Sequence, residues 1–376
     1  MHLAFPCPAP GHTVEWSGFD APWVRDMAAC AQDPVYHPEG DVWIHTKMVC
    51  DALVALPEWQ ALDDNAREIL FAAALLHDVA KPTCTRVDGG HIRHPNHSLR
   101  GAVRARRLLW EADAPPKMRE QVANLIRYHQ APFFLIDETD PLRRAARISL
   151  VTRCDWLGLL ARADALGRTS PDRARILDQI ALYEEYCREL GCADRAWPFP
   201  SSHSRFLYFR TPERNPYYHA HDSSRFQVYM MSGLPGAGKS TWIRKHRAEP
   251  VVSLDELRVE LRLGPGESGS LAAGRARELA REYLRRAESF VWDATNVTRD
   301  LRRKVVDLCV EYGARITIIF VDTPCKRLYR QNRARPAPVP EPVLGHLLDR
   351  WEPPDMTEAH EVLWITREGN PDLTSQ

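Results

Sequence analysis

The sequence predicts two domains, an all-α N-terminal domain and a C-terminal α/β domain built on a parallel sheet. Apolar residues recur at helical spacing through the first half of the 376-residue chain. In the second half, short apolar strands alternate with helices, which is typical of a parallel sheet covered on both faces. Residues 191–224 show neither pattern. We therefore expect domains at 1–190 and 225–376, with 191–224 as an interdomain connector.

The N-terminal helices are best defined at residues 64–77. There DNAREILFAAALLH places apolar side chains at helical spacing, after Asp63 or Asp64 as a cap. Proline and glycine gather between such runs, as in 33–41 and 85–96, and no part of this half indicates a strand ladder. Similar helical runs lie near 44–55, 98–112, 117–129, 142–151, 153–165 and 173–190.

The connector and the C-terminal elements follow in order. The connector is rich in proline and in aromatic residues, so we expect it to pack against one or both domains rather than to act as a free tether. Strands are expected at 226–231, 251–254, 290–293 and 315–322, and helices at 239–247, 255–263, 271–288 and 298–312.

The composition is typical of a globular protein, with 44% hydrophobic and 27% charged residues. Fifty Lys and Arg balance fifty Asp and Glu, so local basic patches, rather than net charge, would have to hold a nucleic-acid partner. No apolar window of about 18 residues indicates a membrane span, and the N-terminus lacks a secretory pattern. The nine cysteines form no CxxC pair, which favours reduced core thiols in a cytoplasmic protein.

A phosphate-binding loop is predicted at residues 233–241, where GLPGAGKST matches GxxxxGK[ST] between a strand and a helix. Its glycines allow the backbone N–H groups to point at phosphate oxygens, next to a helix N-terminus. Lys239 would reach the β- and γ-phosphates, and the Ser240 hydroxyl would bind Mg²⁺. The expected ligands of ATP, or of another nucleoside triphosphate, and of Mg²⁺ are Gly233, Gly236, Gly238, Lys239, Ser240 and Thr241.

Two further features of the second half are compatible with phosphoryl transfer. Asp255 ends the strand that follows the loop, where it could accept the proton of an attacking hydroxyl, or merely cap the next helix. Arg258 lies one helical turn further on and could hold a phosphate of the acceptor. The basic segment 325–340 is either a solvated face or a lid that closes over ATP, and its candidate clamping residues are Arg330, Arg333 and Arg335.

Together these motifs resemble the polynucleotide 5′-kinase family of P-loop phosphotransferases, over about residues 226–362. The resemblance rests on GLPGAGKST, SLDELR, WDATN, ITIIFVDTP and RQNRARPAPVPEPVL. It implies that Lys239 and Ser240 bind ATP and metal, that Asp255 is the general base for a 5′-hydroxyl, and that Arg258 contacts the adjacent phosphate. Two of the three lid arginines would clamp the ATP phosphates.

Histidines and aspartates form a second constellation in the first half of the chain. Imidazole and carboxylate are ligands for divalent metals, and helices distant in sequence can present them to one centre. Two positions keep alternatives, His94 or His97 in HIRHPNHSLRGA, and Asp155 or Asp164 in RCDWLGLLARADALGR. The other candidates are His45, His77, Asp78 and His129.

The order of these residues resembles the HD-domain phosphohydrolase superfamily, over roughly residues 20–190. HPEGDVWIHT, LLHDVAKP and RADALGR look closest to the HD module that accompanies bacterial tRNA nucleotidyltransferases. The resemblance implies one or two divalent ions, either transition metals or Mg²⁺, and it favours His97 over His94 and Asp164 over Asp155. It also implies that Lys81 and Arg168 face the substrate phosphate. The implied metal ligands are His45, His77, Asp78 and Asp164, with His97 and His129 for a second ion.

With both regions in one chain, the sequence resembles bacterial bifunctional end-healing enzymes that join an HD domain to a kinase domain. They imply an enzyme that phosphorylates 5′-OH ends and removes a 2′,3′-cyclic, 2′- or 3′-phosphate. Its partners would be RNA or DNA termini and an RNA ligase of the same pathway. One alternative is a small-molecule or nucleotide kinase fused to an HD nucleotidase. Another is an ATP-sensing regulator with a degenerate HD domain, against which the intact motif residues argue.

Overall fold

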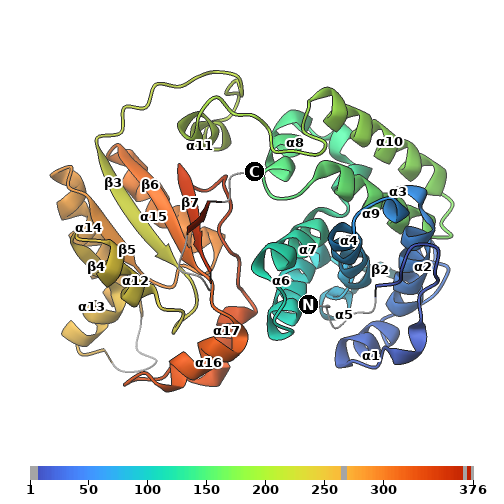
Figure 1. Ribbon diagram of the computed structural model, residues 1–376, viewed down its shortest axis with the longest axis horizontal. Coiled ribbons are helices and arrows are strands. Elements are labelled where there is room, and N and C mark those ends of the chain that lie inside the picture. Colours follow the sequence, from blue (N-terminus) through green and yellow to red (C-terminus); the bar gives the residue numbers. More distant parts are fainter. Residues whose placement is uncertain (1–6, 264–268, 367–370, 374–376) are drawn as a thin grey trace. The chain divides into compact units, whose positions relative to one another are not determined.

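A computed structural model describes residues 7–263, 269–366 and 371–373. The chain divides into two compact units, Met1–Trp197 and Pro198–Gln376 (Figure 1). The first is helical and the second contains a mainly parallel sheet, as the sequence predicts. Within the described residues, no helix combines the length and the apolar character needed to cross a membrane.

The N-terminal unit is built around helix α4, in which every residue from Ile69 to Leu76 is buried. The helix begins after Asp63, whose side chain accepts the Ala66 N–H. Helices α2, α7 and α9 pack against α4. The helices are α1 (Pro22–Ala28), α2 (Val42–Ala55), α3 (Pro57–Gln60), α4 (Asp64–Leu76), α5 (Lys81–Cys84), α6 (His97–Glu111), α7 (Pro116–Tyr128), α8 (Pro141–Ser149), α9 (Cys154–Leu166) and α10 (Arg173–Glu189).

A small hairpin corrects the expectation that this half has no strands. Strand β1 (Arg86–Asp88) pairs antiparallel with β2 (His91–Arg93). Gly89 and Gly90 between them have φ values of 58° and 83°, the left-handed conformation that a tight hairpin turn requires. The Asp-Gly-Gly sequence signals such a turn, but the two strands are short and largely exposed, so the burial pattern gives no sign of them.

The C-terminal unit is a six-stranded sheet in the order β4-β5-β3-β6-β7-β8, in which β8 alone is antiparallel to its neighbour (Figure 1). The pairs of β3 with β5 and with β6 place Val228 between Phe290 and Ile316 in the core. The strands are β3 (Phe226–Ser232), β4 (Val251–Ser253), β5 (Phe290–Asp293), β6 (Ala314–Val321), β7 (Glu361–Ile365) and β8 (Pro371–Leu373). The helices are α11 (Ser202–Arg210), α12 (Lys239–His246), α13 (Leu254–Glu260), α14 (Gly269–Arg285), α15 (Arg299–Glu311), α16 (Cys325–Arg333) and α17 (Glu341–Leu348).

The segment expected to connect the domains contains helix α11, which the sequence pattern did not indicate. Phe206 on this helix belongs to the core cluster of the C-terminal sheet. Arg205 donates hydrogen bonds to the carbonyls of Met356 and His360, at 2.9 and 2.7 Å. Much of residues 198–224 therefore packs within the C-terminal unit.

Candidate functional site

Six residues predicted as metal ligands come together inside the N-terminal unit. Five helices supply them. Two of the histidines directly follow the last turn of a helix, and another is the first residue of α6. All six residues are at most 8% exposed, namely His45, His77, Asp78, His97, His129 and Asp164.

The histidine rings are fixed in one orientation by the main chain. The Nδ1 atoms of His77, His97 and His129 lie 2.7, 2.8 and 2.7 Å from the carbonyl oxygen three residues earlier. A carbonyl can only accept a hydrogen bond, so each Nδ1 carries a proton, and Nε2 is the ring atom that remains to bind a cation. The Nε2 atoms of His77 and His97, with that of His45, are buried and have no hydrogen-bond partner among the described residues. Such atoms are suited to bind a cation.

The ligand atoms form two groups that share one carboxylate. Single ligand atoms of His45, His77 and Asp78 lie within 4.8 Å of one another, and so do those of Asp78, His97 and His129. Asp164 is 3.2 Å from His45 Nε2, and Asp78 is 3.1 Å from His77 Nε2. These close pairs lack hydrogen-bond geometry, which is expected when both atoms point at a third position. The donor set fits divalent ions of the type that imidazole and carboxylate bind, with Asp78 between them.

Electrostatics favour the charged form of both carboxylates. Burial alone would raise the pKa of Asp78, but attraction by His77 and Lys81 outweighs burial and lowers it well below the ordinary value. For Asp164, burial is outweighed in the same way by Arg168. Burial lowers the pKa of His129 to about 3, and the neighbouring imidazoles add to this effect, so the ring is neutral.

The two cations predicted to face substrate are paired with the carboxylates. Lys81 Nζ donates to Asp78 Oδ2 and to Gln32 Oε1, both at 2.7 Å. Arg168 donates to both oxygens of Asp164, at 2.7 and 2.8 Å through one nitrogen. The side chains therefore balance the negative charge at the centre.

Sequence reasoning missed one supporting residue, Glu39. Its Oε1 lies 3.1 Å from His45 Nδ1 and 2.8 Å from His37 Nδ1, and its side chain is 2% exposed. A carboxylate behind a metal-binding histidine orients the ring and raises its basicity. The HPEGD segment places Glu39 six residues before His45, but no periodicity links the two positions.

The alternatives His94 and Asp155 lie outside these groups. His94 Nδ1 is 3.2 Å from the Thr85 hydroxyl, and Asp155 pairs with Arg153. Neither belongs to the two groups of ligand atoms that share Asp78.

The phosphate loop of the C-terminal unit adopts backbone conformations that favour glycine. Gly233, Gly236 and Gly238 have φ values of 141°, 80° and 104°. A Cβ at Gly233 would lie 2.7 Å from the carbonyl oxygen of Val321. The loop lies between β3 and α12, and α12 begins at Lys239.

Lys239 and Ser240 are held at the loop itself. Lys239 Nζ donates to the carbonyls of Gly233 and Leu234 at 2.9 and 3.1 Å, and burial lowers the pKa of Lys239 to about 8. Ser240 Oγ donates to Asp293 Oδ2 at 3.1 Å. Burial raises the pKa of Asp293 despite the attraction of Lys239. Asp293 is a second residue missed from the sequence; the signal was its place at the end of β5, in WDATN.

Asp255 is not the cap of its helix, so that alternative is wrong. Ser253 occupies the N-cap of α13 and accepts the Glu256 N–H. The Asp255 side chain is 82% exposed, and its Oδ2 lies 3.5 Å from Nη2 of Arg335. Arg258 is also exposed, one turn further along α13.

The end of helix α16 lies against the phosphate loop. A Cβ on Gly236 would be 3.3 Å from the backbone nitrogen of Asn332. The side-chain amide of Asn332 donates a hydrogen bond to the Val339 carbonyl at 2.8 Å and accepts one from the Val339 N–H at 3.0 Å. These two bonds hold the ends of the segment between the two residues together. Arg335 within that segment approaches Asp255, whereas Arg333 makes an exposed pair with Glu341 at 3.5 Å. Arg330 lies in the last turn of α16.

Comparison with known proteins agrees with the division of the chain into two units. Residues 42–168 match the family described as HD domain, and residues 228–354 match the family described as AAA domain. The multifunctional CCA protein of Halorhodospira halophila is 36% identical over 108 residues, which are 29% of this chain and 24% of that protein. The multifunctional CCA protein of Acidovorax sp. is 30% identical over 177 residues, 43% of this chain and 39% of that protein. The chain thus spans well under half the length of these curated relatives.

A solved structure from the PezAT toxin–antitoxin system of Streptococcus pneumoniae is also similar. It shares 14% identity, with a TM-score of 0.28, and the match covers 45% of this chain and 77% of that one. The matches define two classes of domain within one chain: a region that matches the HD domain, and a region with a phosphate loop that matches the AAA domain. HD domains bind divalent metals and P-loop kinases use a nucleotide with Mg²⁺, in agreement with the two donor sets.

Proposed function

We propose that the protein heals nucleic-acid ends, with RNA as the preferred substrate. The C-terminal domain phosphorylates 5′-OH ends with ATP. The N-terminal domain removes a 2′,3′-cyclic, 2′- or 3′-phosphate by hydrolysis. The two products are the ends that an RNA ligase joins, so a ligase of the same pathway is the expected partner.

The hydrolytic half of the proposal rests on the group of ligands that share Asp78. A divalent ion bound there lowers the pKa of water and polarises a phosphoryl oxygen. The protein supplies imidazoles of fixed orientation and ionised carboxylates. Lys81 and Arg168 hold Asp78 and Asp164 in the ionised state and add positive charge where negative charge grows at phosphorus.

The kinase half rests on the surroundings of the phosphate loop. Lys239 exchanges its bonds to loop carbonyls for bonds to ATP phosphates, and Ser240 with Asp293 supports Mg²⁺. Asp255 accepts the proton of the 5′-hydroxyl as that oxygen attacks the γ-phosphorus and ADP leaves. Arg258 holds the phosphate next to the acceptor, and Arg335 moves from Asp255 to the transferring group.

The main observation in support of a polymeric acceptor is the exposure of the predicted general base, Asp255. The Asp255 side chain is 82% exposed, and Arg258 beside it is exposed as well. A kinase for a small molecule encloses its acceptor, since that excludes water from the reacting atoms. An open acceptor side with a neighbouring arginine suits the end of a strand, which brings its own phosphate contact.

The test is an RNA that carries a 5′-OH and a 2′,3′-cyclic phosphate, incubated with ATP and a panel of divalent ions. We expect an ATP-dependent 5′-phosphate and a metal-dependent loss of the terminal phosphate, both read on the same molecule. If neither end changes with any ion, the proposal is wrong. The same assay on DNA determines the polymer preference.

The alternative is a nucleotide kinase fused to a nucleotidase. It predicts that free nucleosides are phosphorylated at rates equal to those of oligonucleotides. We expect instead that oligonucleotides are preferred, because Arg258 has no phosphate to bind in a free nucleoside. Equal rates would favour the alternative.

A further inference from the structure

Three cysteines from separate parts of the N-terminal unit lie together in its interior. Cys154 is the first residue of α9, Cys187 lies near the end of α10, and Cys192 follows in the loop after α10. Their exposed fractions are 0%, 1% and 0%. No CxxC spacing links them, so the cluster could not be predicted from the sequence.

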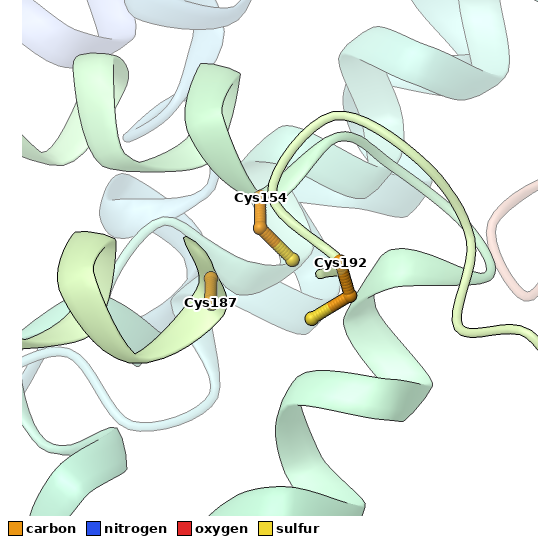
Figure 2. A group of neighbouring side chains, drawn as sticks. All are labelled: Cys154, Cys187 and Cys192. Atoms are coloured by element: carbon orange, nitrogen blue, oxygen red, sulfur yellow. The ribbon is translucent and has the colours of Figure 1, made fainter. Parts of the chain in front are cut away.

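The three sulfur atoms are close enough to bind one ion. All three Sγ atoms lie within 4.8 Å of one another. Figure 2 shows the side chains of Cys154 and Cys192 turned toward the space between the three segments, with Cys187 beside them. The backbone fixes this arrangement, because the Cys192 N–H donates to the Cys187 carbonyl at 3.0 Å and the Asp155 N–H donates to the Ala193 carbonyl at 2.9 Å.

The start of helix α9 favours negative charge at the three sulfur atoms. Cys154 stands at the N-terminus of the 13-residue helix α9, where a negative charge is stabilised. The buried Tyr183 hydroxyl donates a hydrogen bond to the Cys154 carbonyl at 3.3 Å.

We propose that Cys154, Cys187 and Cys192 form a binding site for a thiophilic divalent ion, Zn²⁺. Soft thiolates select such ions, and three of them around Zn²⁺ leave one net negative charge, which the start of α9 offsets. On binding, the ion replaces the thiol protons, which leave to solvent, and no electron is transferred. Within the described residues no further cysteine, histidine or carboxylate joins the group, so these three cysteines are the ligands that the protein supplies.

The site would hold the loop after α10 against the start of α9. It is separate from the HD ligands, whose donors are nitrogen and oxygen. The inference is independent of the proposed function, and each can fail without the other.

The test uses the full chain, purified without oxygen and loaded with Co²⁺ in place of Zn²⁺. We expect an intense sulfur-to-cobalt charge-transfer band that the nitrogen and oxygen ligands of the HD group cannot produce. Cys192→Ser should abolish this band. The matched control, Cys309→Ser, removes another fully buried thiol in the C-terminal unit and should leave the band unchanged. Circular dichroism shows whether each variant is folded.

X-ray absorption at the zinc edge of the unaltered protein gives a reading that needs no folded variant. We expect sulfur neighbours at a zinc–sulfur distance of about 2.3 Å. Zinc surrounded by nitrogen and oxygen alone would overturn the proposal, as would a cobalt band that survives Cys192→Ser in a folded protein. A mass lower by two hydrogens after anaerobic purification would identify a disulfide instead, and would also overturn it.

Discussion

At the scale of single residues, burial of the metal-ligand candidates of the N-terminal unit opposes folding unless they bind a cation. Nε2 of His45, His77 and His97 and Oδ1 of Asp78 are buried without hydrogen-bond partners among the described residues. Each unsatisfied polar atom costs about 1–3 kcal/mol, so four of them oppose folding by several kcal/mol. Bound metal supplies the missing partner to all four, and we therefore expect chelation to lower the melting temperature of the N-terminal unit.

His129 tests whether the site holds a second ion. One of its ring nitrogens lies within 4.8 Å of ligand atoms of Asp78 and His97, and its Nδ1 is already bonded to the Ile126 carbonyl. We expect His129→Ala to lower the bound metal from two ions to one per chain and to reduce phosphate release about 10–100-fold, the range for disturbed metal sites. Metal content is measured by elemental analysis after gel filtration. His94→Ala is the control and should keep both ions; an unchanged metal content in His129→Ala would leave one ion as the correct number.

Asp293 tests the metal side of the phosphate loop. It accepts the Ser240 hydrogen bond and lies buried at the end of β5. Without its carboxylate, Mg²⁺ loses a fixed partner, so we expect Asp293→Ala to lower kcat of phosphoryl transfer by about 100-fold or more. Asp300→Ala, on the exposed face of α15, is the control and should retain full activity. Equal rates for the two variants would remove Asp293 from the site.

At the scale of elements, the close approach of α2 to the end of α9 brings two ligands together. Gly167 follows α9 and lies against Val49 of α2, so that a Cβ there would be 2.7 Å from the Val49 nitrogen. The same approach sets the 3.2 Å distance between His45 and Asp164. A larger residue at position 167 must push the helices apart.

We therefore expect Gly167→Ala to weaken metal binding and to destabilise the N-terminal unit by about 1–3 kcal/mol, the usual cost of overpacking. Urea unfolding with and without metal measures both effects. Gly18→Ala is the control, because a Cβ there meets no atom within 4 Å. Unchanged metal affinity in Gly167→Ala would show that the helix spacing does not control the ligand geometry.

Elements with strong periodicity could be predicted from the sequence, and short ones could not. Helix α4 and strands β3 and β6 are long, apolar runs whose burial follows from the pattern. The β1–β2 hairpin is exposed, and α11 depends on contacts of Arg205 and Phe206 with distant residues. Local sequence contains no record of such contacts.

The functional sites likewise contain residues that could be predicted from the sequence and residues that could not. The phosphate-loop residues could be named from their spacing and the HD residues from a family resemblance, and the structure brings the members of each set together. Glu39 and Asp293 could not, because each acts through a neighbour that only the fold provides. The pairing of Lys81 and Arg168 with carboxylates likewise needs three-dimensional information.

At the scale of the whole molecule, the central claim is that one chain holds two independent centres for phosphorus chemistry. Each unit has its own buried core and its own set of polar residues. Neither set shares a ligand with the other. Inactivating one centre should therefore leave the rate of the other unchanged.

The most direct measurement compares His77→Ala with Lys239→Ala on the RNA that carries both unhealed ends. We expect His77→Ala to lose phosphate release and to keep 5′-phosphorylation, and Lys239→Ala to show the reverse. Loss of both activities from one substitution, in a protein whose circular dichroism is unchanged, would contradict the account.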